Sequence, residues 1–175
     1  VTHNNTVVGR RFLCYTLPRN AGRVAPMKIT EALRAEHLVF HSMFDYLEMA
    51  VPKLKSLAEI QALAALMESM LGDHSDVEDA LFLGPLEHCF EQLGQRDALL
   101  EEHQEIDENL ELVQAAANMV QARKRLLAAL DYSRRHFDRE ERVVFPMAER
   151  LLKAKTLTGL GQTWVERRMD KSGGA

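Results

Sequence analysis

The sequence predicts an all-α protein, an antiparallel up-down-up-down four-helix bundle followed by short C-terminal helices. Four long segments carry apolar residues at the spacing of one helix face, and short connections join them. No segment alternates between polar and apolar residues as a half-buried strand does. The length of 175 residues is sufficient for one domain with a sizeable core.

The first two predicted helices cover residues 28–50 and 57–83. Thr30 is the expected cap of the first helix, and Pro52 stops it because proline cannot continue a helix. The second helix ends or kinks at Gly84-Pro85, a strong helix-breaking pair. Both segments therefore have a defined end in the sequence.

Further helical segments follow. A short continuation of the second helix reaches about residue 93, and two long helices are then predicted over residues 96–117 and 119–144. Pro146 starts a short helix to about residue 154, and a last amphipathic segment contains Trp164. The four long helices form the predicted bundle, and the remaining pieces lie at its end.

Both ends of the chain are expected to lie outside the bundle, which we place at residues 27–170. Residues 1–26 contain four arginines, no acidic side chain and no helical period, so we expect an irregular or non-native extension. Met27 directly precedes the first helix, and translation is expected to begin there. Residues 171–175 are expected to form a loose tail.

The composition restricts the kinds of partner and the cellular compartment that we expect for this protein. The arginines of residues 1–26 leave the rest of the chain more acidic than its net charge of −4 indicates, which argues against nucleic acid as a partner. Charged residues interrupt every long apolar run, so no membrane span is predicted. Two cysteines, Cys14 and Cys89, do not make a disulfide framework, and a reducing, cytoplasmic location is expected.

Two matching histidine–glutamate steps are the most informative motif. His74 and Glu78 are four residues apart in one predicted helix, and His136 and Glu140 are four apart in another. Residues at this spacing lie on one helix face, one turn apart. Each step can therefore direct an imidazole and a carboxylate at the same point, and a proline follows each step along the chain.

A faint internal repeat surrounds these steps. Glu36-His37 on the first predicted helix mirrors Glu102-His103 on the third. The two steps are mirrored in the same way on the second and fourth helices. Two helix hairpins related by a pseudo-twofold axis would place their half-sites opposite each other.

The four histidines of this repeat fall on the apolar faces of their helices, and they are predicted to point into the bundle together with Glu78 and Glu140. Unpaired buried carboxylates are costly, and metal coordination would satisfy all six side chains at once. The alternative is a purely structural polar network, in which every member must be hydrogen-bonded.

The donor set indicates the kind of metal. It contains only imidazole and carboxylate, which disfavours structural zinc and iron–sulfur clusters and suits two first-row metals, with iron fitting best. Glu78 and Glu140 could each bridge both metals. Each metal would then have two imidazoles and two carboxylate oxygens, with positions left for a bridging oxygen species and an exogenous ligand.

The pattern resembles the hemerythrin HHE cation-binding family over roughly residues 28–154, including the proline after each step. The resemblance implies two non-haem iron ions, bridged by carboxylates and by an oxo or hydroxo group. It implies reversible binding of O₂, or sensing of O₂, NO, peroxide or iron, and it assigns no catalytic residue. The implied metal ligands are His37, His74, Glu78, His103, His136 and Glu140.

Three more residues bear on this centre. Oxygen-carrying hemerythrins have a second histidine on the third helix where this chain has Asp107, which is expected to accept a hydrogen bond near the metals or to bind one. His41 lies one turn after His37 and either supplies the missing imidazole or flanks the ligands. Tyr132 lies one turn before His136 and either reaches the metal pocket or remains a hydrogen-bonded tyrosine near the bundle end.

Other functions stay open alongside O₂ binding. A ferritin-like oxidase or iron store would use Glu-x-x-His steps, and this chain has no glutamate three residues before any histidine. A hemerythrin-like centre could still decompose peroxide or act as an oxidase. A third alternative is an iron-responsive regulatory module that acts on a protein partner through the segment containing Trp164, and the sequence does not identify that partner.

Overall fold

The computed structural model describes residues 26–92 and 96–173, and every element among them is helical, which confirms the predicted all-α class. Residues 1–25 of the expected extension and residues 174–175 of the expected tail lie outside the described part. The four long helices are α1 (Ile29–Ala50), α2 (Leu57–Glu78), α4 (Arg96–Gln114) and α5 (Met119–Arg139).

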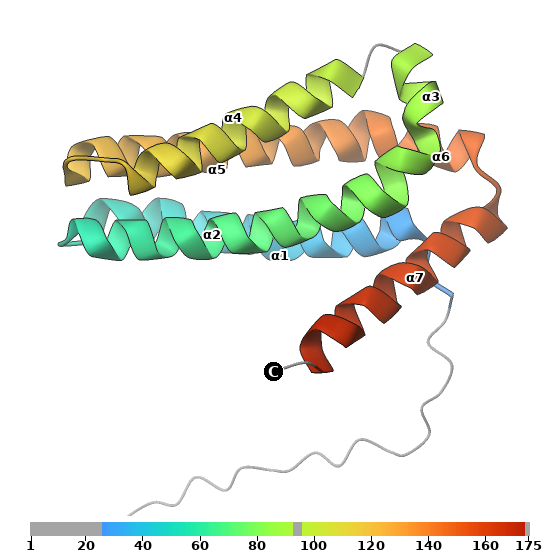
Figure 1. The fold of residues 1–175 in the computed structure, drawn as a ribbon, viewed down its shortest axis with the longest axis horizontal. Helices are drawn as coiled ribbons and strands as arrows, with labels where there is room; N and C mark the ends of the chain where they lie inside the picture. The colour runs from blue at the N-terminus through green and yellow to red at the C-terminus, as the bar shows by residue number, and fades with distance from the viewer. Residues whose placement is uncertain (1–25, 93–95, 174–175) are drawn as a thin grey trace, which may run out of the picture.

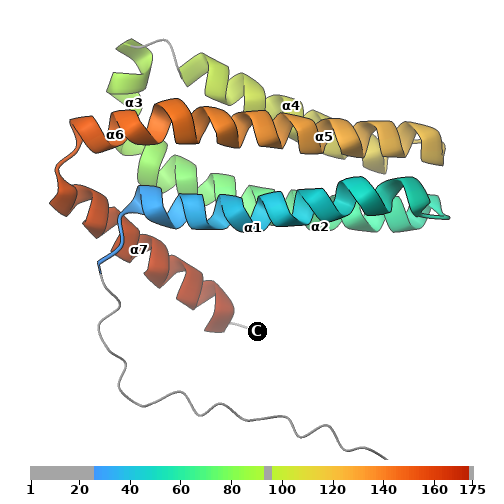
Figure 2. The same ribbon diagram turned by 180° about the vertical axis from the view of Figure 1, so that it is seen from behind.

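The four long helices lie side by side in both views (Figures 1 and 2). The colour gradient in Figure 1 runs leftwards in α1 and α4 and rightwards in α2 and α5. The 3₁₀ turn η1 (Val51–Lys53) follows α1, and α3 (Gly84–Gln92) and α6 (Phe145–Leu151) lie at the opposite end. Among the described helices, none has the combination of length and apolar composition needed to cross a membrane.

Helix starts are set by local capping. Ser56 accepts a hydrogen bond from the Glu59 backbone N–H, and the Glu59 carboxylate accepts from the Ser56 N–H, which makes a capping box at α2. Asn118 caps α5 by the same kind of contact. The prediction for Thr30 was wrong: it is buried inside α1, because its hydroxyl donates to Glu149 of α6 at 2.8 Å.

Two π-helical segments interrupt the predicted long helices. The segment η2 (Asp79–Leu83) follows α2, and η3 (Glu140–Val144) follows α5. The N–H of Gly84 donates to the Asp79 carbonyl, and the N–H of Phe145 donates to the Glu140 carbonyl, five residues back in each case. The next residue is a proline in both, which lacks an N–H and crowds the preceding turn. Such π-turns occur frequently at functional sites.

The core consists of two apolar clusters at different levels along the long helices. The first cluster includes Phe44, Met67, Leu110, Leu126 and Phe137. The second includes Leu33, Val77, Leu99, Phe145 and Leu157. Helices α1, α2 and α4 contribute to both clusters, and α5 reaches the second cluster through η3 and α6. The candidate metal ligands lie near the boundary between the two clusters. A polar layer is therefore enclosed by apolar side chains on both sides.

Helix α7 (Ala154–Gly173) crosses α1 after a short connection. Leu157 is buried in the second cluster, and Gly161 is buried where α7 meets the chain just before α1. A Cβ atom at Gly161 would overlap the carbonyl oxygen of Met27. Residues 171–173, expected in the loose tail, continue this helix.

We predict that Gly161→Ala destabilises the protein, because the new methyl group would overlap backbone that has no room to move freely. A loss of about 1–3 kcal/mol in the free energy of unfolding is expected. Gly159→Ala is the matched control, since a Cβ there meets nothing within 4 Å; in a helix interior it should gain up to about 1 kcal/mol. Denaturant unfolding of the two variants measures the difference, and equal stabilities would contradict the close approach of α7 to Met27.

Candidate metal centre

The six predicted ligands meet in the polar layer between the two apolar clusters. His37 comes from α1, His74 and Glu78 from α2, His103 from α4, and His136 from α5. Glu140 is the first residue of the π-segment η3. Five of the six are buried, and the side chain of His103 is 14% exposed. Residues separated by about a hundred positions in the chain are thus brought to one point.

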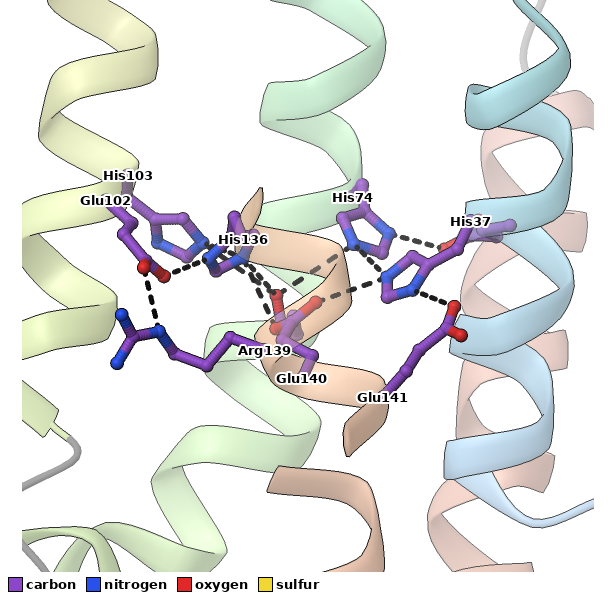
Figure 3. Close-up of polar contacts among 10 residues, drawn as sticks. His37, His74, Glu102, His103, His136, Arg139, Glu140 and Glu141 are labelled. Carbon is purple, nitrogen blue, oxygen red and sulfur yellow. Dashed lines mark hydrogen bonds and ion pairs between the residues drawn. The ribbon is translucent and has the colours of Figure 1, made fainter. Parts of the chain in front are cut away.

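The ligand atoms form two groups, and in each group the two histidines of one helix hairpin lie with the glutamate of the other hairpin. His37 and His74 of the first hairpin lie with Glu140 of the second, and the donor atoms of the three are within 4.8 Å of one another. In the other group, His103 and His136 lie with Glu78 of the first hairpin. Figure 3 shows the two imidazole pairs on either side of Glu140. This crossing matches the pseudo-twofold arrangement expected from the repeat.

Within each group the two imidazoles face each other through Nε2. The Nε2 atoms of His37 and His74 are 3.3 Å apart, and those of His103 and His136 are 3.0 Å apart. Two nitrogens bound at right angles to one first-row metal, each at about 2.1 Å, would be about 3.0 Å apart. The spacing in both pairs therefore fits two imidazoles on a shared cation.

The two carboxylates lie between the imidazole pairs. Oε2 of Glu140 is 3.2 Å from Nε2 of His37, and its Oε1 is 3.3 Å from Nε2 of His136, so the two oxygens face different groups. Oε2 of Glu78 lies 3.9 Å from Nε2 of each of three histidines, His74, His103 and His136. This placement is what a carboxylate shared between two metals requires.

The carboxylate oxygens of Glu78 and Glu140 lack hydrogen-bond partners among the described residues. All four oxygens of Glu78 and Glu140 are buried, and none has a partner with hydrogen-bond geometry among the described residues. A charge buried in this way costs several kcal/mol unless it is compensated. Cation binding would compensate both carboxylates, so the residues present fit a pair of metal ions.

An outer set of carboxylates fixes three of the imidazoles. Nδ1 of His37 lies 3.0 Å from Glu141, Nδ1 of His74 lies 2.9 Å from Glu36, and Nδ1 of His136 lies 3.2 Å from Glu102. A carboxylate accepts the Nδ1 proton, which leaves Nε2 directed at the centre as a ligand atom. Partners of this kind orient metal-binding histidines and raise their basicity. Figure 3 shows Glu102 and Glu141 in this role.

Aromatic packing sets the planes of the rings. The imidazole of His37 stacks on Phe137 with centroids 4.0 Å apart and planes 10° apart. Phe40 and Phe137 both present their rings to His74 edge-on, at 5.4 Å. These rings belong to the first apolar cluster and shield that side of the centre from water.

In each histidine pair, the pKa of one imidazole is lowered and the pKa of the other is raised. Burial, reinforced by the neighbouring charged imidazole, lowers the pKa of His37 and that of His103 to about 4. Burial also lowers the pKa of His74 and His136. For His74 the hydrogen bond to Glu36 and the charge of Glu78 outweigh burial, and for His136 the charge of Glu140 and the hydrogen bond to Glu102 do so, which raises both values. One imidazole of each pair therefore holds a proton readily.

The central carboxylates differ in the same way. Burial and the charge of Glu140 raise the pKa of Glu78. Burial raises the pKa of Glu140 as well, but the charge of His136 outweighs it and lowers the value. Protons held on this network compete directly with metal ions for the same lone pairs.

The three further residues named from the sequence lie around the centre rather than in either ligand group. Nδ1 of His41 accepts a hydrogen bond from Arg134 at 3.3 Å, so this atom is engaged away from the metal ligands. Tyr132 packs under the guanidinium of Arg135 at 4.4 Å. Asp107 lines a small cavity beside the ligands, and burial together with the charges of nearby glutamates raises its pKa.

The sequence reasoning missed the outer carboxylates and their supports. Glu141 directly follows Glu140 in the chain, and its carboxylate lies 3.0 Å from Nδ1 of His37. Glu36 and Glu102 were visible as members of the repeat, and that symmetry was the available signal for a shared role. Nothing in the sequence pointed to Arg168, which lies 2.6 Å from Glu36 across the fold.

The comparison with protein families agrees with this geometry. Residues 95–160 match the model of the hemerythrin HHE cation binding domain. The resemblance seen in the sequence is thereby confirmed. The hemerythrin match contains His103, His136 and Glu140, whereas His37, His74 and Glu78 precede it and join the same cluster through the fold. No curated protein and no solved structure gives a match to the chain.

We predict that iron(II) binding weakens as the pH falls, since the raised pKa values of His74 and His136 let protons occupy ligand positions above the usual histidine range. Affinity should change by about tenfold per pH unit for each proton displaced. An anaerobic competition titration between about pH 6 and about pH 8 measures this slope, around the ordinary histidine value. A flat profile over that interval would contradict the protonation pattern described above.

Proposed function

We propose that this chain is a non-haem diiron protein with an up-down-up-down four-helix bundle, and that it binds O₂, NO or peroxide reversibly or senses them. The observation that carries the proposal is the pair of facing imidazole couples that share two buried carboxylates. The hemerythrin match supports iron as the metal. The alternating direction of the long helices in Figure 1 supports the bundle.

In this proposal the protein residues have distinct tasks. His37 and His74 would hold one iron and His103 and His136 the other, and Glu78 and Glu140 would be shared between the two. When bound, two irons supply reversible electron transfer and open coordination positions to a small ligand. The outer carboxylates keep each imidazole in the tautomer that directs Nε2 inwards, and the phenylalanines around His37 keep water away from that face.

A small cavity lies beside this centre. It has a volume of about 10 Å³ and is lined by ligand histidines and by Ser75 and Asp107, among other residues. A space of this size accommodates about one water-sized molecule. That size favours a diatomic or peroxide-sized ligand over a larger substrate.

Asp107 bears on the choice between carriage and sensing. It stands where oxygen-carrying hemerythrins have a further imidazole, and its carboxyl group lines the cavity beside the ligand histidines. A carboxyl group there supports a redox or sensing role over simple O₂ carriage. The same feature favours peroxide decomposition as the second candidate function, because that reaction needs proton transfer at the ligand.

Anaerobic reconstitution with iron(II), followed by exposure to O₂, NO and H₂O₂, tests the proposed function. We expect two irons per chain and a visible absorption band that appears with O₂ or NO and disappears when the gas is removed. Irreversible oxidation with O₂ evolution from peroxide would assign the enzyme alternative. One iron per chain, or none, would overturn the diiron proposal.

Two histidine variants test the ligand assignment. His103→Ala removes a predicted ligand and should lower the iron content from two ions to one, because it leaves His136 as the single imidazole of its pair. His41→Ala is the matched control, since His41 belongs to neither of the two ligand groups; it should retain both irons and the O₂-dependent band. Metal analysis of the purified variants gives the result, and equal iron loss in the two would refute the assignment.

A further inference from the structure

Helix α7 contacts the candidate metal centre through a chain of charged side chains. Nη2 of Arg168 lies 2.6 Å from Oε1 of Glu36, and the other carboxylate oxygen of Glu36 lies 2.9 Å from Nδ1 of His74. Nε2 of His74 is directed at the centre. A residue near the C-terminus is therefore two contacts away from a predicted metal ligand.

The contact between Arg168 and Glu36 is largely withdrawn from solvent. The side chains are 23% and 20% exposed, so the ion pair is screened less than one on an open surface. Trp164 lies one turn earlier on α7, beneath the Arg168 guanidinium at 5.7 Å. Burial raises the pKa of Glu36, but the hydrogen bond and charge of His74, together with the charge of Arg168, outweigh burial and lower it.

The second half of α7 depends on this contact more than the first half does. Leu157 and Gly161 are buried and anchor the first turns. From residue 162 to residue 170, the side chains that the structure describes are exposed or partly exposed. Trp164 and Arg168 contribute packing and an ion pair there, so this half of α7 is expected to undock at a lower cost than the first half.

The outer carboxylate of the His103–His136 half-site is supported by an arginine from a different helix. Glu102 accepts the Nδ1 proton of His136, as Glu36 does for His74. Its support is Arg139, whose Nε donates to Glu102 at 2.7 Å, and Arg139 belongs to α5 itself (Figure 3). One half-site is therefore completed within the four long helices, and the other is completed by α7.

We propose that Arg168 is a positioning residue for the His37–His74 half-site, so that docking of α7 and metal binding at that half-site stabilise each other. This inference rests on the proposed metal-binding function. A metal ion on Nε2 withdraws electron density from the imidazole and makes its Nδ1–H a stronger donor to Glu36. A firmly held Glu36 in turn keeps the ion pair with Arg168 in one geometry.

The coupling between metal binding and the docking of α7 acts in both directions. If the metal stabilises docked α7, then release of α7 must weaken the metal by the same factor. The weakening is confined to the His37–His74 half-site, because the Arg139–Glu102 support does not involve α7. A factor that pulls on the C-terminal helix would thus selectively release or expose one of the two metals.

Hydrogen exchange of the full chain, with and without anaerobic iron(II), tests the coupling. We expect iron to slow amide exchange over residues 162–170 in the wild-type protein by about fivefold or more, within the usual range of coupling energies. Arg168→Gln should abolish this iron dependence and weaken one of the two irons by about tenfold, the lower end for loss of an outer-sphere partner. Arg168→Lys keeps the positive charge and should restore part of both effects.

Arg139→Gln is the matched control. It removes the equivalent support from Glu102 and should also weaken one iron, but the iron dependence of α7 exchange should remain. Two irons in the wild-type protein with unchanged α7 exchange would overturn the coupling and leave the proposed function standing. Absence of iron binding would overturn both, and identical behaviour of the Gln variants at 139 and 168 would refute the asymmetry.

Discussion

The burial of Glu78 and Glu140 between four imidazoles is the constraint on which the rest of the structure depends. Neither carboxylate can be left charged and unpaired in an apolar interior at a tolerable cost. The protein surrounds them with four Nε2 atoms, holds three of the imidazoles by outer carboxylates, and holds two of those carboxylates by arginines. The two apolar clusters then enclose this layer from both sides. The stability of the core and the candidate metal centre thus depend on one network.

The helix ends follow from the same constraint. Glu78 is the last residue of α2, and Glu140 is the first of η3, so both central carboxylates lie where the helix changes to a π-turn ahead of a proline. The wider turn keeps the backbone hydrogen-bonded up to the residue before the proline. Within η3, Glu141 contacts Nδ1 of His37 and Val144 is buried in the second cluster.

Helical periodicity was sufficient to predict the four long helices and the six inward residues, because burial on a helix face is a local property of the sequence. The steps of His74 with Glu78 and His136 with Glu140 were readable for the same reason. The Thr30 cap was wrong because a tertiary hydrogen bond to Glu149 outweighed its local preference. Arg168 could not be predicted, since its contact with Glu36 depends on how α7 crosses α1.

Anomalous diffraction from crystals of the iron-loaded protein tests the central claim most directly. We expect two iron peaks about 3.5–4 Å apart, one between the Nε2 atoms of His37 and His74 and one between those of His103 and His136, with Glu78 and Glu140 in contact with both. A single peak, or peaks placed away from these imidazole pairs, would contradict it.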